Sequence, residues 1–241
     1  MNFSQELHEL RNLLFIDIET VSCEATYEQL NAVMQKLWQR RAKRVDDKAD
    51  PAELFPRSAA LFPEFGKIVC IGVGYFYINE QDELGFRVKS FSGADEQQLL
   101  ENFKSLLENK FNRKTRLVAH NGKEFDYPYL CRRMLINRVR LPEVLQLAGA
   151  KPWEVRHLDT MEMWRFGDRR NLTSLKLLAS VFGIETTKDT IDGSMVNDVY
   201  YNDHDLDRIA AYCRNDVIVT AQIYLAMKTL PGLKSENIFE V

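Results

Sequence analysis

The octapeptide Leu13-Leu14-Phe15-Ile16-Asp17-Ile18-Glu19-Thr20 is the most informative segment of this sequence, because a strongly apolar run carries acids two residues apart. Side chains alternate across a strand, so Asp17 and Glu19 lie on one face. Neighbouring carboxylates that are partly desolvated repel each other unless a positive charge compensates, and a divalent cation can do so. The octapeptide alone leaves a second interpretation open, an exposed strand end with two ordinary acids.

Around this strand the sequence predicts an α/β chain. Apolar and β-branched residues over 67–78 and 84–91 predict a hairpin, and residues 116–119 predict a short strand. A hairpin that precedes a crossover implies a mixed sheet. Helical spacing, with a capping box at Ser92 to Asp95 and Pro128 in a first turn, predicts helices over about 96–107, 128–135, 172–181 and 205–230.

About 45 residues separate the first strand from the hairpin, which is too many for a plain loop. We therefore expect an insertion at about 21–66 within a single domain that spans 1–241. Thr26 and Gln29 are placed to cap an amphipathic helix over about 27–37 whose far end is basic. The sequence leaves open whether the insertion covers an active site or forms a dimer contact.

Composition excludes several classes of protein. With 45% hydrophobic and 28% charged residues, the chain has enough apolar material for a core and is not disordered. The longest nearly apolar run, 68–78, is too short to cross a bilayer, and no targeting segment is visible, so a cytoplasmic protein is expected. The four cysteines lie far apart, which argues against a zinc or disulfide framework.

The formal net charge of −3 means that any binding of nucleic acid must be local. Three basic clusters are present, each of which is more simply a solvated face: Arg132, Arg133, Arg138 and Arg140; Arg165, Arg169 and Arg170; and Arg40, Arg41, Lys43 and Arg44.

Two further segments carry acids in suggestive places. Asp126 follows a strand at the start of a helix, where an acid is ordinarily an N-cap. Tyr212 and Asp216 are four residues apart in the last helix and share a face. Taken alone, that pair is an ordinary tyrosine beside a surface aspartate.

Together these segments resemble the three motifs of the DnaQ-like (DEDD) superfamily of 3′→5′ exonucleases. Phe15 to Thr20 look like the first motif, Asn121 to Asp126 match the N-x-x-x-F-D form of the second, and Tyr212 to Asp216 match the Y-x-x-x-D third. Ala211 stands where the histidine subclass would have its histidine, so the tyrosine (DEDDy) subclass is implied. Residues 60–71, 192–194 and 209–213 are similar to the predicted exonucleases related to the proofreading domain of family B DNA polymerases.

The resemblance covers about residues 10–230 and implies a ribonuclease H-like fold, a mixed β-sheet flanked by α-helices with a helical insertion after the first strand. It also implies a two-metal-ion mechanism, and hard oxygen ligands suit Mg²⁺ or Mn²⁺. Asp17 would bridge both ions, and Glu19 and Asp216 would complete the site of the nucleophilic water. Asp126 would hold the second ion through water, and Tyr212 would orient the nucleophile.

For the substrate, the resemblance implies that Thr20 and Asn121 contact the terminal nucleotide. Phe125 is a candidate for stacking on a base, although core packing is an equal alternative. Asp159 lies outside the motifs and is interpreted as structural. Other aromatic residues beside a basic cluster that could stack on bases or pack in the core are Tyr127, Trp164 and Phe166.

The sequence thus predicts a metal-dependent 3′→5′ exonuclease that degrades single-stranded DNA to nucleoside 5′-monophosphates. No polymerase domain fits in the remaining residues, so a freestanding nuclease is expected. One alternative is an exoribonuclease of the RNase D type, which the lack of a recognisable RNA-binding appendage disfavours. The other is an inactive nucleic-acid-binding module, which the intact motif residues disfavour. The oligomeric state is left open.

Overall fold

The computed structural model describes residues 9–80, 82–111, 114–151, 153–168, 170, 172–186 and 191–241. Within those residues the chain forms a mixed six-stranded sheet in the order β5-β4-β1-β2-β3-β6. The strands are β1 (Leu13–Ser22), β2 (Gly66–Ile78), β3 (Leu84–Ser92), β4 (Arg116–Ala119), β5 (Leu158–Asp159) and β6 (Ile238–Glu240). β1 runs antiparallel to β2 and parallel to β4, which confirms the predicted mixed sheet.

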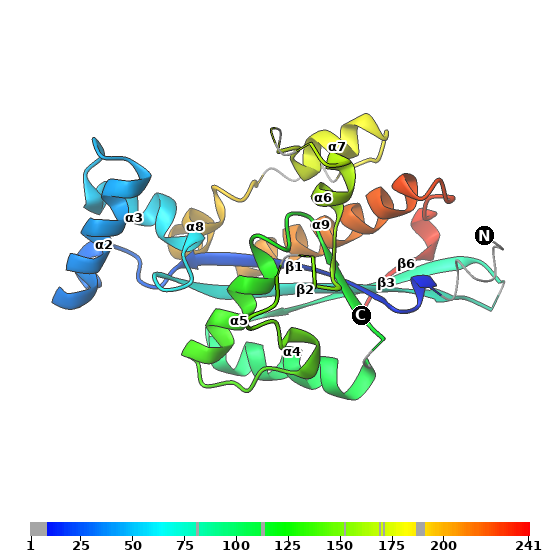
Figure 1. Ribbon diagram of the computed structural model, residues 1–241, viewed down its shortest axis with the longest axis horizontal. Coiled ribbons are helices and arrows are strands. Elements are labelled where there is room, and N and C mark those ends of the chain that lie inside the picture. Colours follow the sequence, from blue (N-terminus) through cyan, green and yellow to red (C-terminus); the bar gives the residue numbers. More distant parts are fainter. Residues whose placement is uncertain are drawn as a thin grey trace.

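Helices cover both faces of the sheet (Figure 1). They are α2 (Ala32–Val45), α3 (Pro51–Ser58), α4 (Glu96–Lys110), α5 (Asp126–Ile136), α6 (Thr160–Arg165), α7 (Leu175–Val181), α8 (Val196–Asp198) and α9 (Leu206–Met227). Short helical turns lie at Tyr27–Gln29, Ala59–Leu61, Glu143–Leu145, Val199–Asp203 and Ser235–Asn237. No helix among the described residues has both the length and the apolar character needed to cross a membrane.

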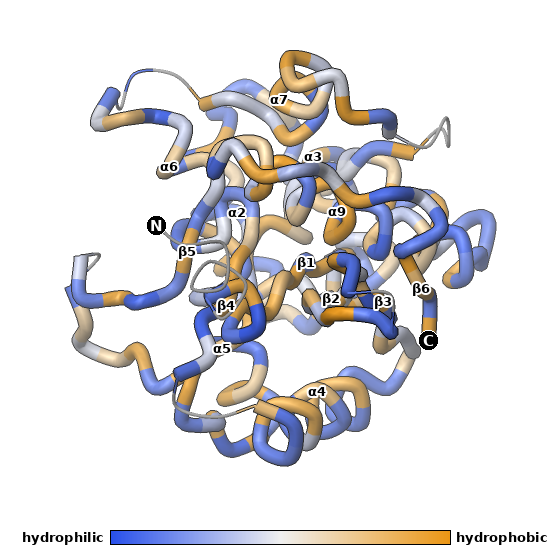
Figure 2. Tube along the Cα trace, turned by 90° about the vertical axis from the view of Figure 1, so that its right-hand side faces the viewer, coloured by the Kyte–Doolittle hydropathy of each residue, from blue (hydrophilic) through white to orange (hydrophobic). Residues whose placement is uncertain are grey.

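The alternation of β1 divides the core into layers. Leu14, Ile16 and Ile18 pack with α4 and α5, whereas Phe15 packs with α9, where its ring centroid is 5.7 Å from that of Tyr224. Figure 2 shows hydrophobic residues along the central strands and hydrophilic ones on the outer parts of the chain. β1 is therefore buried on both faces, and its odd-numbered side chains point to the α9 layer.

Most predicted elements are confirmed. The short strands β5 and β6 and the helices α3, α6 and α8 were not predicted, and the other differences lie at helix ends. The insertion helix begins at Ala32 instead of residue 27, because Leu30 is extended and Asn31 caps the helix. The cap of α4 is Asp95, not Ser92, and α7 begins after the cap Ser174. Helical spacing predicts that Leu135 lies on the apolar face of α5, but Leu135 is 62% exposed, so that face is narrower than predicted.

The insertion after β1 has a core of its own. The chain leaves the sheet at Cys23 and returns at Phe65, where a backbone hydrogen bond of 2.8 Å joins the two. Trp38 of α2 is fully buried against Phe55 of α3 and Phe65, with ring centroids 5.2 Å apart in both pairs. The Trp38 Nε1 group donates to the Pro51 carbonyl at 2.7 Å. Aromatic packing therefore makes the insertion a defined unit.

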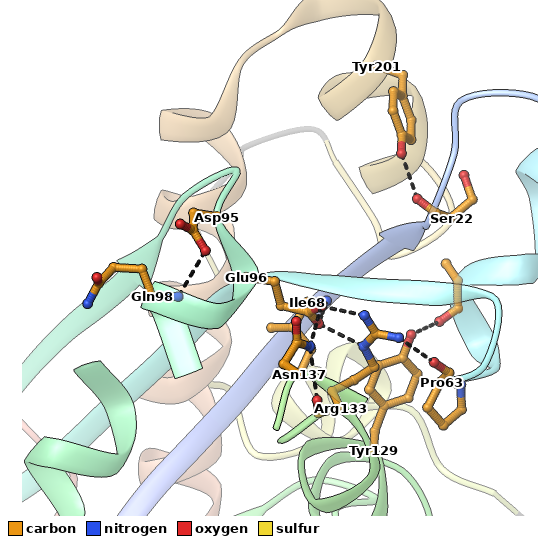
Figure 3. A network of polar contacts seen from close by, with 11 residues as sticks. Ser22, Pro63, Ile68, Asp95, Glu96, Gln98, Tyr129, Arg133, Asn137 and Tyr201 are labelled. Carbon is orange, nitrogen blue, oxygen red and sulfur yellow. Dashed lines mark hydrogen bonds and ion pairs between the residues drawn. The ribbon is translucent and has the colours of Figure 1, made fainter. Parts of the chain in front are cut away.

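A buried ion pair fastens the insertion to α4, α5 and β2 (Figure 3). Glu96 at the start of α4 pairs with the Arg133 guanidinium of α5, and it also accepts hydrogen bonds from the Ile68 amide (2.7 Å) and Asn137 Nδ2 (2.8 Å). Arg133 Nη1 donates to the Pro63 carbonyl at 2.8 Å. Arg133 is only 8% exposed, so its assignment to a solvated basic cluster was wrong.

Removing one member of this pair leaves the other charge buried without a partner. Arg133→Met should therefore lower the free energy of unfolding by about 3 to 5 kcal/mol, measured by urea denaturation. The double variant Glu96→Leu/Arg133→Met should lose less than the sum of the single variants, because no charge remains buried. The exposed neighbour provides the control, since Arg132→Met should change stability by less than about 0.5 kcal/mol. Equal effects at Arg132 and Arg133 would contradict this role.

Candidate active site

The two carboxylates of β1 face helix α9. Asp17 lies opposite Gly72 of β2 in the antiparallel register. A Cβ atom at Gly72 would come within 2.9 Å of Cys213 Sγ and Val217 Cγ2, so only glycine lets α9 pack this closely on the sheet. Gly72 was not among the predicted site residues, although a glycine inside a strand often marks such a close approach. The glycine thus brings α9 next to Asp17.

A β-bulge lies at the end of this acidic segment. Glu19 pairs with Cys70, but Thr20 pairs with Ile68, which leaves Val69 as the extra residue on β2. Bulges bend strands and are frequent next to active sites. Beyond the bulge the Thr20 hydroxyl donates to the Ala60 carbonyl at 3.0 Å. The carboxylates therefore lie where β1 turns toward the insertion.

The loop between β4 and α5 positions Asp126. Asn121 adopts a left-handed conformation (φ 64°), which asparagine tolerates better than most residues, and its carbonyl accepts from the Phe125 amide at 3.0 Å. Asp126 is the first residue of α5 and is 4% exposed. The preceding residue, Phe125, is the N-cap, so Asp126 is not the cap that its position alone favours. Its carboxyl group is thus buried at the helix start without a capping role.

Asp159 holds the same loop in place. Its carboxylate accepts hydrogen bonds from four backbone amides, those of Asn121 (2.9 Å), Lys123 (3.1 Å), Met161 (2.9 Å) and Glu162 (3.2 Å). These contacts occupy both carboxylate oxygens and support the structural interpretation made from the sequence.

Tyr212 and Asp216 share one face of α9, as their spacing predicts. They interact through a side-chain hydrogen bond, which lowers the pKa of Asp216. Burial outweighs that effect and raises the pKa of Asp216 to about 6. Burial and the nearby carboxylates also raise the pKa of Tyr212 above its ordinary value, so its hydroxyl stays protonated at neutral pH.

The four carboxyl groups are electrostatically coupled. Burial raises the pKa of Asp17 well above its ordinary value, and Glu19, Asp216 and Asp126 raise it further. The pKa of Glu19 is also raised, first by burial and then by Asp216. Burial raises the pKa of Asp126 to about 7, and Asp159 contributes. The fold therefore brings acids from β1, α5 and α9 into one electrostatic group.

The side chains present fit divalent cations. Asp17 Oδ2 is buried and has no hydrogen-bond partner among the described residues, an expensive state that a bound cation would relieve. Ligand atoms of Asp17, Glu19 and Cys213 lie within 4.8 Å of one another. Burial raises the pKa of the Cys213 thiol, which donates to the Asp17 carbonyl at 3.4 Å. A neutral thiol is a poor ligand for a hard cation, so the carboxylate oxygens are the relevant donors.

The other predicted residues have different surroundings. Phe125 is partly buried, 5.2 Å from the Tyr129 ring, and packs against the core. Tyr127 is 1% exposed and donates to the Leu158 carbonyl at 2.6 Å, and Trp164 packs on Phe182. Tyr127 is thus a packing residue and not an exposed stacking platform, whereas Trp164 is partly buried. Phe166 is 91% exposed, whereas Arg169 lies outside the described residues.

Most of the chain matches a known family of proteins. Residues 62–240 match the family described as predicted 3′-5′ exonucleases related to the exonuclease domain of PolB. The chain also resembles the solved structure of the family B DNA polymerase from the hyperthermophilic archaeon Pyrobaculum calidifontis, with a TM-score of 0.54 and 15% sequence identity. That match covers 89% of this chain and 24% of the polymerase, so this chain spans about a quarter of its length. No curated protein matches the sequence.

The raised pKa values predict how stability depends on pH without metal. The folded protein binds protons that the unfolded chain releases near pH 4, so stability should fall as pH rises through about 6 and 7, the folded pKa values of Asp216 and Asp126. We expect the melting temperature in EDTA to decrease between pH 5 and pH 8.

Asp17→Asn tests the repulsion among these carboxyl groups, because it removes a carboxylate that repels the others. In EDTA at pH 7.5 it should melt about 2 to 4 °C above the unmodified protein. Millimolar Mn²⁺ should reverse that order, because only the unmodified site gains full binding free energy. If Asp17→Asn melts lower in both buffers and Mn²⁺ shifts neither protein, a shared cation site is wrong.

Proposed function

Because this chain belongs to the family of predicted 3′-5′ exonucleases related to the exonuclease domain of PolB, we propose that it hydrolyses single-stranded DNA from the 3′ end and releases nucleoside 5′-monophosphates. The observation that carries the proposal is the electrostatic coupling of the four carboxyl groups around the unpartnered Oδ2 atom of Asp17. Gathering acids from distant segments destabilises the folded state. A divalent cation bound among them would offset that repulsion and could also bind a substrate phosphate.

Asp17, Glu19, Asp126 and Asp216 would hold two Mg²⁺ or Mn²⁺ ions. Bound there, such ions would supply an activated water and neutralise the charge that develops on the phosphate. The protein's own part is to fix the four carboxylates on three rigid elements, so that no ligand has to be ordered when the substrate arrives.

Tyr212 would orient the attacking water and not deprotonate it. Its raised pKa keeps the hydroxyl protonated, so it is a poor general base. Hydrogen bonding to Asp216, one turn along α9, holds the ring in place. Its proton is used in that bond, so the phenol oxygen would accept a hydrogen bond from the water next to the carboxylates.

Thr20 and Asn121 would contact the terminal nucleotide. The Thr20 hydroxyl proton is already used by the Ala60 carbonyl, so its oxygen would serve as an acceptor. Asn121 lies partly exposed in the loop that leads to Asp126. Phe125 would support that loop by packing on Tyr129, with no direct stacking on a base.

Digestion of end-labelled oligonucleotides tests the proposal. With Mg²⁺ or Mn²⁺, 5′-labelled single-stranded DNA should give a ladder that shortens from the 3′ end, and 3′-labelled DNA should release labelled mononucleotide at once. EDTA should abolish both. Matched RNA oligonucleotides should be cut more slowly, and a preference for RNA would favour the exoribonuclease alternative. Undiminished activity in EDTA, or shortening from the 5′ end, would refute the proposed reaction.

Substitution of Tyr212 tests its role separately. Tyr212→Phe should lower the rate about 10-fold or more while Mn²⁺ still raises the melting temperature, because only one hydroxyl is removed. Asp17→Ala should lose nearly all activity. Tyr224→Phe is the matched control, a buried tyrosine on the same helix that packs on Phe15, and it should keep the full rate. Equal losses in Tyr212→Phe and Tyr224→Phe would show that another residue orients the water.

A further inference from the structure

Helix α2 of the insertion presents a row of cations away from its own core. Lys36, Arg40, Lys43 and Arg44 are all exposed, and their spacing of four, three and one places them on one side of the helix. Trp38 and Ala42, the buried residues of α2, lie on the opposite side. We call these four cations the α2 basic row.

The charges of this row are not neutralised by the protein. No acidic residue occurs in α2, and within the described ranges none of the four cations forms an ion pair. The acids that follow the helix are partly used by the backbone, since Asp46 accepts from the Lys48 amide and Asp50 caps α3. Like charges three and four residues apart destabilise a helix, although cations near its C-terminus gain from the helix dipole.

The position of the insertion relates this row to the candidate active site. β1 leads from Glu19 through Thr20 directly into the insertion, which lies beyond the end of the sheet in Figure 1. The hydroxyls of Thr20 (3.0 Å) and Tyr129 (2.9 Å) both donate to the Ala60 carbonyl. With the Arg133 contact to Pro63, these bonds fix the insertion against α5, the helix that carries Asp126.

The cations near α6 differ from the α2 basic row, because acids neutralise them. Lys123 pairs with Glu162 at 2.6 Å, and Arg170 pairs with Asp168 at 3.0 Å. Arg165 lies 3.7 Å from Glu124. Among the described residues, the cations of α2 are therefore unpaired, whereas these cations near α6 are paired.

Resting on the proposed function, we infer that the α2 basic row binds the phosphates of the substrate strand upstream of its 3′ end. From Lys36 to Arg44 the row is about 12 Å long at 1.5 Å per residue, long enough to contact more than one consecutive phosphate of an extended strand. The row would thus add a strand-holding surface to the catalytic sheet.

The test removes the charges and keeps the helix. In Lys36→Gln/Arg40→Gln/Lys43→Gln/Arg44→Gln, binding of a fluorescent 20-nucleotide single strand, measured by anisotropy in EDTA, should weaken at least 10-fold. The slope of log K against log salt concentration should fall by up to about 3. With Mg²⁺, the kcat/KM ratio of the 20-mer to a dinucleotide should also fall at least 10-fold.

Two control variants distinguish the effect of the α2 basic row from the effect of net charge. Neutralising Lys110, Arg132, Arg138 and Arg140 changes net charge equally on exposed cations of the α4 and α5 side, and it should leave binding within 2-fold. The exchange Lys36→Arg/Arg40→Lys/Lys43→Arg/Arg44→Lys keeps the charge and should bind like the unmodified protein. Circular dichroism confirms that each variant is folded.

The outcomes distinguish this inference from the proposed function. Binding in EDTA needs no hydrolysis. If the unmodified protein has no nuclease activity but the α2 variant binds the 20-mer more weakly than it does, only the proposed exonuclease activity is refuted. Equal weakening in both neutralised variants would overturn the α2 assignment. So would an α2 variant that binds the 20-mer normally but no longer binds vesicles with 30% anionic phospholipid, a result that would assign the row to a membrane surface.

Discussion

Repulsion between Asp17 and Glu19 on a buried central strand is the constraint around which this molecule is arranged. Their ligand atoms lie within 4.8 Å, a separation at which two full charges repel by about 3 kcal/mol at an effective dielectric near 20. The folded state partly avoids this cost by holding protons, which is the meaning of the raised pKa values. Asp126 and Asp216 add to this negative charge instead of neutralising it, as expected of a site that binds cations.

The surroundings keep these acids together when their charges would separate them. Gly72 allows α9 to lie close to β1 and β2. The Asp159 carboxylate joins two amides of the loop before Asp126 to two amides at the start of α6. The buried pair of Glu96 and Arg133 joins α4, α5, β2 and the insertion. Stability therefore resides in packing and in polar contacts made by residues other than the four repelling carboxylates.

The chain divides its tasks between the sheet and the insertion. β1, α5 and α9 position the carboxylates and Tyr212. The insertion has its own aromatic core and meets the sheet through Thr20 and the Ala60 carbonyl. A basic helix on the insertion would give a protein of net charge −3 a local affinity for a polyanion.

The sequence by itself determined what depends on local periodicity. Alternation put Asp17 and Glu19 on one face, helical spacing paired Tyr212 with Asp216, and apolar patterns located the hairpin and α9. The tertiary structure alone showed that Arg133 is buried on Glu96, 37 positions away along the chain, while its neighbour Arg132 is exposed. It likewise separated packed Tyr127 and Trp164 from exposed Phe166. Local backbone geometry fixes which side of an element a residue occupies, but its burial depends on which distant segment packs against that side.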